Sequence, residues 1–344
     1  MKALVYGGPG KKSWEEKAKP LLLHPSDAIV RITRTTICGT DLHILKGDVP
    51  AVEKGRILGH EGVGVIEEVG QGVQSFKKGD RCLISCITSC GRCAPCKSER
   101  YSHCENGGWV LGHLIDGTQA EYVRIPFADT SLYRIPEGVD EAPLVTLSDT
   151  FPTGFEVGVL NGKVSLGKTV AIVGAGPIGI AALLTAKLFS PEAIYLIDRD
   201  LFRLELARSF GATETVDAGA RDPVAAIKEW TGKGVDVAIE AVGTPATFDI
   251  CQNILAPGGR LAVVGVFGES VTLRLEKLWI ENVTLTTGLV DTKTIPLLLR
   301  MVLAGRLDAG KLITHRFPLD QIEQAYETFS QAAREKALKI VLQK

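Results

Sequence analysis

The chain has 344 residues, and its 39 lysines and arginines nearly match its 40 aspartates and glutamates, giving a formal net charge of -1. Such balance argues against a nucleic-acid or membrane-surface partner. The length exceeds one ordinary domain, so two domains are expected. The N-terminus lacks the apolar segment of a signal peptide and no apolar run is long enough to span a membrane, which predicts a cytoplasmic protein.

The first 150 residues are predicted to form short strands. Residues 27–35 (DAIVRITRT) and 63–70 (VGVIEEVG) are rich in β-branched residues, and Gly, Pro and Asp separate such runs. This part of the chain is therefore expected to be rich in β structure.

After residue 150, apolar runs alternate with helical patterns. Strands are expected at 168–176, 193–198, 235–243, 260–266 and 283–290, and helices at Pro177–Phe189 and Leu201–Phe210. Runs this continuously apolar are typical of strands buried on both faces of a parallel sheet. Residues 152–292 are predicted to form a doubly wound α/β domain.

The last fifty residues exceed what such a sheet requires. They contain two helical patterns, IPLLLRMVLAG and DQIEQAYETFSQAA, and end in the strand pattern KALKIVLQ. We expect them to pack on the N-terminal part, so that the other domain comprises residues 1–151 and 293–344.

The sequence GAGPIG, between the first strand and helix of the α/β domain, predicts a dinucleotide-binding turn. Glycines at this spacing permit a tight turn, close approach to a pyrophosphate and close helix packing, and the helix N-terminus offers free amides. The expected cofactor-binding residues here are Gly174, Gly176, Pro177, Ile178 and Gly179.

Asp198 ends the next predicted strand, nineteen residues beyond Gly179. A carboxylate at this point accepts hydrogen bonds from ribose hydroxyls and repels a 2′-phosphate, which favours NAD over NADP. Arg199 and Arg203 follow it. They either form a solvated helix face or, for Arg203, contact the ribose.

Two N-terminal segments, ICGTDLH and LGHEGVG, supply candidate metal ligands. Alone, Cys38 or His60 would be read as a packed residue. Together they offer a thiolate and an imidazole, two of the three protein ligands of an open catalytic zinc site.

With these motifs, GHEGVGVIEEVGQGV at 59–73, a four-cysteine segment and GAGPIG in the same order, the chain resembles the zinc-dependent medium-chain alcohol dehydrogenases, and in particular their bacterial secondary-alcohol branch. The resemblance covers nearly the whole chain. It implies an α/β fold with a GroES-like, β-rich catalytic domain and a Rossmann domain.

The resemblance also implies the roles of individual residues. Cys38, His60 and Asp149 would bind the catalytic zinc, Asp149 lying four residues before Thr153. Many relatives have Cys at the position of Asp149. Glu61 would be able to enter the zinc sphere, and Asp41 would accept a hydrogen bond from the second ring nitrogen of His60.

Proton transfer is expected to involve Thr40 and His43. Hydride would pass from the alcohol to nicotinamide C4, while Thr40 accepts the proton and passes it through the nicotinamide ribose towards His43. Alternatively Thr40 is a turn hydroxyl and His43 a surface histidine. Thr153 would pack beside the nicotinamide. Gly39 stands where some relatives carry a basic residue that holds the pyrophosphate.

Cys90, Cys93, Cys96 and Cys104 fall within SCGRCAPCKSERYSHC. Disulfides are disfavoured in a reducing compartment, and no thioredoxin-like pattern supports a redox pair. A bacterial ferredoxin run places its fourth cysteine after three residues followed by proline, whereas seven residues intervene here and Glu105 follows. Four thiolates at this spacing predict a closed structural zinc site.

Other candidates carry less information. Cys82, Cys86 and Cys251 fit core positions, and His113 is expected simply to be packed. Trp109, Leu111 and Leu289 line the substrate cleft or belong to the core.

The sequence therefore predicts an NAD-dependent, two-zinc dehydrogenase of secondary alcohols and ketones, forming a dimer or tetramer. Alternatives are a polyol, butanediol or threonine dehydrogenase of the same family. Less favoured are a zinc-free quinone reductase and a non-catalytic dinucleotide-binding protein.

Overall fold

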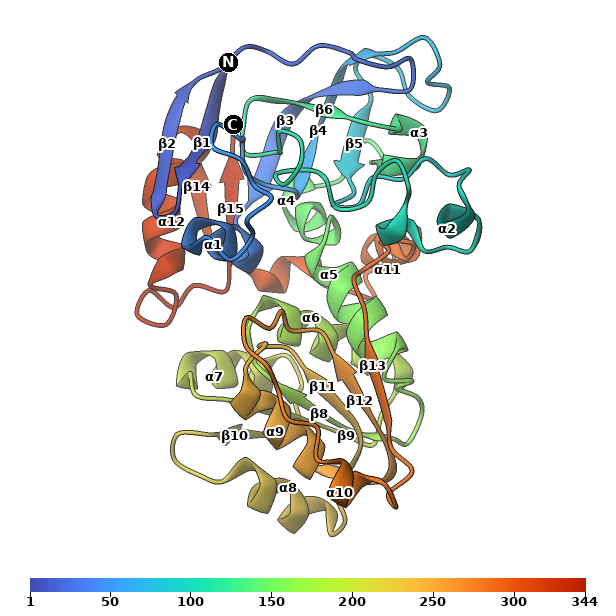
Figure 1. Ribbon diagram of the computed structural model, residues 1–344, viewed down its shortest axis with the longest axis vertical. Helices are drawn as coiled ribbons and strands as arrows, with labels where there is room; N and C mark the ends of the chain where they lie inside the picture. Colours follow the sequence, from blue (N-terminus) through green and yellow to red (C-terminus); the bar gives the residue numbers. More distant parts are fainter. The chain divides into compact units, whose positions relative to one another are not determined.

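The computed structural model describes residues 1–344 (Figure 1). The chain forms two compact units, each with its own sheet. One combines Met1–Asp149 with Asp291–Lys344, and the other is Thr150–Val290.

The unit Thr150–Val290 contains a six-stranded sheet in which all neighbours are parallel. Its strands, in spatial order, are β10 (Glu214–Asp217), β9 (Ala193–Asp198), β8 (Thr169–Val173), β11 (Val235–Glu240), β12 (Leu255–Val263) and β13 (Thr284–Thr287). In chain order this is 3-2-1-4-5-6, the doubly wound arrangement. The predicted parallel sheet is confirmed, and β10 is an additional strand that the sequence pattern did not indicate.

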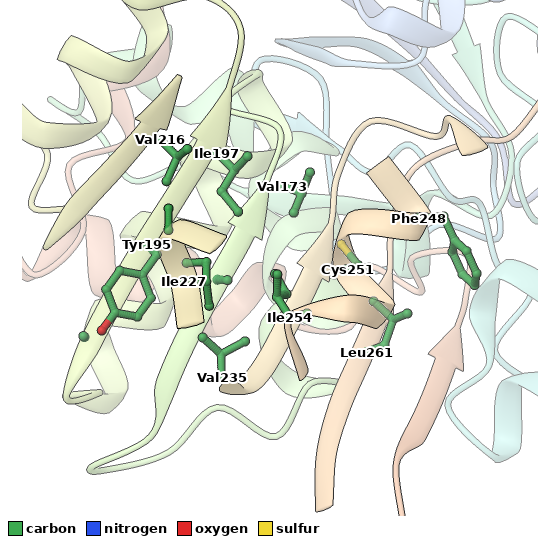
Figure 2. Close-up of a cluster of buried hydrophobic side chains, with 14 of the residues drawn as sticks. Val173, Tyr195, Ile197, Val216, Ile227, Val235, Phe248, Cys251, Ile254 and Leu261 are labelled. Carbon is green, nitrogen blue, oxygen red and sulfur yellow. The ribbon is translucent and has the colours of Figure 1, made fainter. Parts of the chain in front are cut away.

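Helices follow most of these strands. They are α6 (Pro177–Ala186), α7 (Leu201–Ser209), α8 (Pro223–Thr231), α9 (Pro245–Asn253) and α10 (Leu275–Leu278). Two further helical segments, α5 (Thr150–Pro152) and a π-helical segment (Thr153–Leu160), precede β8. Figure 2 shows the core formed by inward-facing strand residues such as Val173 and Ile197 with Ile227 of α8 and Phe248 of α9. Cys251 of α9 is fully buried in this core, as expected.

The other unit is built on a seven-stranded sheet and a hairpin. The sheet contains β14 (Ile313–Pro318), β15 (Lys339–Gln343), β3 (Ala28–Thr36), β4 (Gly62–Val69), β5 (Arg81–Ile84) and β7 (Leu132–Arg134) in that order, with β6 (Tyr122–Ile125) beside β3. The hairpin consists of β1 (Lys2–Gly8) and β2 (Lys11–Glu16). The C-terminal strand β15 pairs antiparallel with β3, so the end of the chain lies against the N-terminal part in this sheet.

Short helices connect these strands. They are α1 (Gly39–Lys46), α2 (Ala94–Lys97), α3 (Ala128–Ser131), α4 (Glu141–Leu144), α11 (Ile295–Leu303) and α12 (Ile322–Ser330). Tyr326 and Phe329 of α12 share a core with Ile37 and with Ile44 of α1, so the C-terminal helix supports the loop that carries Cys38. None of the helices has the length and hydropathy that crossing a bilayer requires.

Candidate active site and metal centres

Cys38, His60 and Asp149 come from three separate connections of one unit and converge on one point. Cys38 is the residue before α1, His60 lies just before β4, and Asp149 follows the short 3-10 turn Val145–Leu147. One sulfur, one ring nitrogen and one carboxylate oxygen of these residues lie within 4.8 Å of one another.

The geometry of this group fits a single metal ion. Oδ2 of Asp149 is 3.3 Å from Nε2 of His60 and 3.8 Å from Sγ of Cys38. Burial lowers the pKa of His60, but hydrogen bonds to Asp149 and Cys38 raise that pKa well above its ordinary value. The negative charge of the neighbours thus favours a cation here. Thiolate, imidazole and carboxylate are zinc's usual protein ligands, and three of them leave a fourth position open.

A side-chain hydrogen bond and a close-packed glycine fix the positions of the loops that carry the ligands. The hydroxyl of Ser148 accepts a hydrogen bond from the Gly62 amide at 3.1 Å and donates to the Gly62 carbonyl at 3.2 Å. Gly59, with φ of +92°, lies so close to Thr118 and Gln119 that a Cβ would be 2.6 Å from Gln119 Cγ. Only glycine fits there, and its turn directs His60 into the site.

Asp41 lies beside the ligand loop, but its hydrogen bonds differ from the expectation. Its Oδ2 accepts from the Cys38 amide at 2.9 Å and from Nε2 of Gln119 at 3.0 Å. Its Oδ1 is buried without a hydrogen-bond partner, so the bond expected from His60 is not formed. The reason is that the carboxylate caps α1, and it acts on His60 only through its charge.

Gln119 extends this contact to the C-terminal helix. The hydroxyl of Tyr326 donates to Oε1 of Gln119 at 2.8 Å, and both side chains are fully buried. Neither residue belongs to a motif that identified the site.

Glu61 is adjacent to His60 and is held by a buried cation. Nζ of Lys339, in β15, donates to Oε2 of Glu61 at 2.5 Å, and the hydroxyl of Thr36 contacts the same oxygen. Burial lowers the pKa of Lys339, but Glu61 and Cys38 raise it above its ordinary value, so the ammonium keeps its charge. The sequence reasoning missed Lys339, although a lysine inside the apolar run KALKIVLQ was a signal.

The two residues expected to move the proton lie on α1. Oγ1 of Thr40 is 3.7 Å from Sγ of Cys38, and His43 is three residues further along the helix. Nδ1 of His43 contacts Oδ2 of Asp48 at 2.9 Å. Residues three apart share one face of a helix, so Thr40 and His43 point to the same side.

Aromatic rings border the ligand group. Trp109 stands edge-on to His60, with ring centroids 6.4 Å apart, and His113 stacks on Trp109 at 4.3 Å. His113 is therefore packed and joins neither metal-ligand group, as expected. Leu111 is fully buried in the core of its unit, whereas Leu289 is half-exposed in the other unit.

The remaining cysteines behave differently from one another. Cys82 is a core residue, as predicted. Cys86 is also buried, but its Sγ lies 3.5 Å from Oδ1 of Asp149, a contact that the sequence did not indicate. Burial and the nearby charge of Asp149 raise the pKa of the Cys86 thiol well above its ordinary value.

The second metal-ligand group is formed by the four clustered cysteines. The sulfurs of Cys90, Cys93, Cys96 and Cys104 lie within 4.8 Å of one another, and all are free thiols. Sγ of Cys93 is 3.9 Å from Sγ of Cys104. Four sulfurs about 2.3 Å from one zinc are about 3.8 Å apart in a tetrahedron, so the spacing fits a single ion with no open position.

The dinucleotide-type turn has the expected local form. Gly174 has φ of +105°, and a Cβ on Gly179 would lie 1.8 Å from the Gly174 carbonyl oxygen. Pro177 and Ile178 begin α6 after Gly176. Gly174 and Gly179 therefore require glycine for backbone reasons.

Asp198 ends β9 beside this turn. Its Oδ2 accepts from the Ala175 amide at 2.6 Å, and its Oδ1 accepts from the amides of Arg199 and Asp200. Arg203 pairs with Asp200 at 3.5 Å, and its guanidinium approaches Gly176. Thr153 begins the π-helical segment of the same unit.

A doubly wound sheet in one unit and an open metal-ligand group in the other define a metal-dependent oxidoreductase. Residues 24–137 match the alcohol dehydrogenase GroES-like domain, and residues 177–304 match the zinc-binding dehydrogenase domain.

Whole-chain relatives agree with these matches. An alcohol dehydrogenase of Cupriavidus necator is 37% identical, covering 99% of this chain and 98% of its own. A probable NADP-dependent isopropanol dehydrogenase of Mycoplasma pneumoniae is 32% identical, covering 94% and 95%. The apo structure of zinc dependent alcohol dehydrogenase 2 from Streptococcus pneumonia is 52% identical over 100% and 98%, with a TM-score of 0.96.

The chain therefore belongs to the zinc-dependent medium-chain alcohol dehydrogenase family. Its activity is that of a zinc-dependent alcohol oxidoreductase, and the predicted combination of GroES-like and Rossmann-type domains is confirmed.

Proposed function

We propose that the protein interconverts secondary alcohols and ketones with NAD, using one catalytic and one structural zinc per chain. The observation that carries this proposal is the convergence of Cys38, His60 and Asp149 with one ligand position left open. A zinc ion bound there supplies Lewis-acid polarisation of the alcohol oxygen, and NAD accepts the hydride. A relative named for isopropanol, a secondary alcohol, supports this substrate class.

The residues of the chain then have distinct tasks. Cys38, His60 and Asp149 bind the metal, and Trp109 shields the His60 edge of the site. The Thr40 hydroxyl, beside Cys38, accepts the proton released from the substrate. His43, partly exposed on the same helix face, exchanges that proton with solvent.

Glu61 and Asp41 act through charge and position. Glu61, paired with Lys339, stands ready to enter the metal sphere, and Asp41 favours the positive charge around His60. The Met1–Asp149 and Asp291–Lys344 unit is thus the catalytic domain, and the unit with the glycine turn binds the nicotinamide coenzyme.

NAD is proposed over NADP because of Asp198. In this proposal Arg203 and the glycine turn bind the adenosine and phosphate end of the coenzyme, and Thr153 packs beside the nicotinamide. The negative charge of Asp198 would repel a 2′-phosphate. We expect Asp198→Gly to weaken NAD use about 10-fold or more, since a hydrogen bond to a charged group contributes about 1.5–3 kcal/mol. Kinetics with NAD and NADP test this, and an unchanged ratio would refute the ribose contact.

A substrate screen and a metal analysis test the rest. We expect simple secondary alcohols, with one hydroxyl group, to be oxidised faster than primary alcohols, polyols, butanediol or threonine. The rate of oxidation is followed by the absorbance of the reduced coenzyme. Preference for a polyol or threonine would establish the alternative dehydrogenases. Fewer than two zincs per chain would overturn the two-site proposal, and no zinc at all would favour a zinc-free reductase or a non-catalytic protein.

Self-association is proposed through the edge of the parallel sheet. β13 has a neighbour on one side only, and exposed apolar residues lie close in sequence, with Trp279 73% and Ile280 61% exposed. Open edges and apolar patches favour pairing with another chain, here as a dimer or tetramer. Light scattering after size exclusion tests this.

The eight free thiols suit the reducing cytoplasm, where we propose that the enzyme acts.

A further inference from the structure

Cys86 lies just after β5 and contacts one residue of the metal-ligand group, Asp149. Its side chain is 3% exposed, and its Sγ is 3.5 Å from Oδ1 of Asp149. The other oxygen of that carboxylate, Oδ2, is the one that faces His60 and Cys38. The two oxygens of Asp149 therefore contact different groups. Oδ2 lies beside His60 and Cys38, and Oδ1 lies beside the Cys86 thiol.

The backbone keeps Cys86 and Asp149 together. The Cys86 amide donates to the carbonyl of Ser148 at 3.1 Å, and the Ser148 side chain is itself bonded to Gly62 at the start of β4. Ser85, on the other side, contacts Thr292 through their hydroxyls at 2.8 Å. The chain at Cys86 is thus held by its own amide and by the neighbouring Ser85.

Cys86 is placed to act on a ligand without being one. The ligand group within 4.8 Å contains Cys38, His60 and Asp149 but not Cys86. A thiol is a weak hydrogen-bond donor, and Oδ1 is an acceptor within its reach. Carboxylates that bind metals are commonly held by such outer contacts, whose loss weakens metal binding.

We propose that Cys86 is a positioning residue whose thiol holds Oδ1 of Asp149, so that Oδ2 alone is offered to the catalytic metal. This inference rests on the proposed zinc site at Cys38, His60 and Asp149. It assigns to Cys86 a role in metal retention and geometry, and none in proton or hydride transfer.

Three variants test the role. Cys86→Ala removes the donor, Cys86→Ser keeps a donor on a shorter side chain, and Cys82→Ala is the matched control. Cys82, four residues earlier in β5, is an equally buried cysteine whose charged neighbours are Glu141 and Asp80 rather than the metal ligands. Zinc release is followed with a chromogenic chelator, and the cobalt-substituted proteins are compared by visible absorption, which reports ligand geometry.

We expect Cys86→Ala to release one of its two zincs about 10–100-fold faster than the parent, the range for loss of an outer contact. Its cobalt spectrum should change, Cys86→Ser should be intermediate, and Cys82→Ala should match the parent. Parent-like release and spectrum in Cys86→Ala would overturn the proposal. So would equal effects in Cys82→Ala, because they would reduce the role of Cys86 to packing.

A Cys38→Ser variant separates this inference from the proposed function. If Cys38→Ser lacks the zinc whose release is accelerated in Cys86→Ala, that ion belongs to the proposed catalytic site and the Cys86 measurements stand. If it retains both ions unchanged, the catalytic site itself is wrong and the inference falls with it.

Discussion

The two metal-ligand groups of this protein are built in opposite ways. The four sulfurs of the closed group come from one stretch of fifteen residues. In the open group, Cys38 and Asp149 are 111 residues apart, and the Lys339–Glu61 pair beside it spans 278. The closed group is thus a local motif, whereas the open group exists only after the sheet has formed.

The surroundings differ as well. The closed group has almost no apolar support beyond Tyr101, and its lobe is tied to the rest of the unit by Ser102 donating to Asp291 at 2.6 Å. The open group is enclosed by buried ionisable residues, among them Asp41, Glu61 and Lys339. A metal at the closed group would therefore stabilise a poorly packed lobe, while the open group depends on the protein around it.

The largest expected difference concerns activity. We expect Cys38→Ser to lower kcat/KM by more than the roughly 100-fold that loss of an outer contact costs, because a direct ligand is removed. NADH binding, measured by fluorescence titration, should persist because the glycine turn belongs to the other unit. Full activity in this variant would remove the catalytic assignment.

The next effect concerns the buried pair beside the open group. Lys339→Met removes the buried ammonium that pairs with Glu61, and we expect the free energy of unfolding to fall by about 3–5 kcal/mol in urea titrations. The control is Lys2→Met, which removes an exposed ion pair with Glu16 and should change stability by less than about 1 kcal/mol. Similar losses in both variants would show that burial of the pair is not what matters.

A smaller loss of stability is expected at the closed group. Cys93→Ser removes one of four thiolates, and we expect about 2–3 kcal/mol, the upper end for an ordinary substitution, because the lobe opens locally. Limited proteolysis should cut between Cys90 and Cys104, while the folded fraction keeps its hydride transfer rate. A stable variant that resists proteolysis and retains two zincs would contradict the stapling role.

Local patterns in the sequence were sufficient to predict the closed group, the glycine turn and the central strands of the parallel sheet. The spacing of the four cysteines and the glycines of GAGPIG predict structures that form within one turn or lobe. Continuous apolar runs predict the central strands of the parallel sheet. At the open site, residue type made Cys38 and His60 candidates, whereas Asp149 came only from the family resemblance, because no spacing rule connects Cys38 with Asp149.

What the sequence did not indicate depends on tertiary pairing. Lys339 reaches Glu61 only because β15 lies beside β3, and Cys86 reaches Asp149 only because its amide bonds to Ser148. The wrong expectation for Asp41 has the same origin. Its position in the motif suggested His60 as a partner, whereas Gln119, 78 residues away, and the Cys38 amide take its Oδ2.

The smallest effect is expected at the far end of this buried network. Tyr326→Phe removes the donor to Oε1 of Gln119, whose amide supports Asp41 and hence the loop of Cys38. A buried acceptor without a donor costs about 1–2 kcal/mol, which should appear in urea unfolding.

Tyr6 provides the control, since it is buried in the same core and takes no part in the Tyr326–Gln119–Asp41 hydrogen bonds. Tyr6→Phe should be nearly neutral. Equal losses in the two variants would attribute the effect to packing of α12. A loss confined to Tyr326→Phe would show that support of the open group extends to the C-terminal helix.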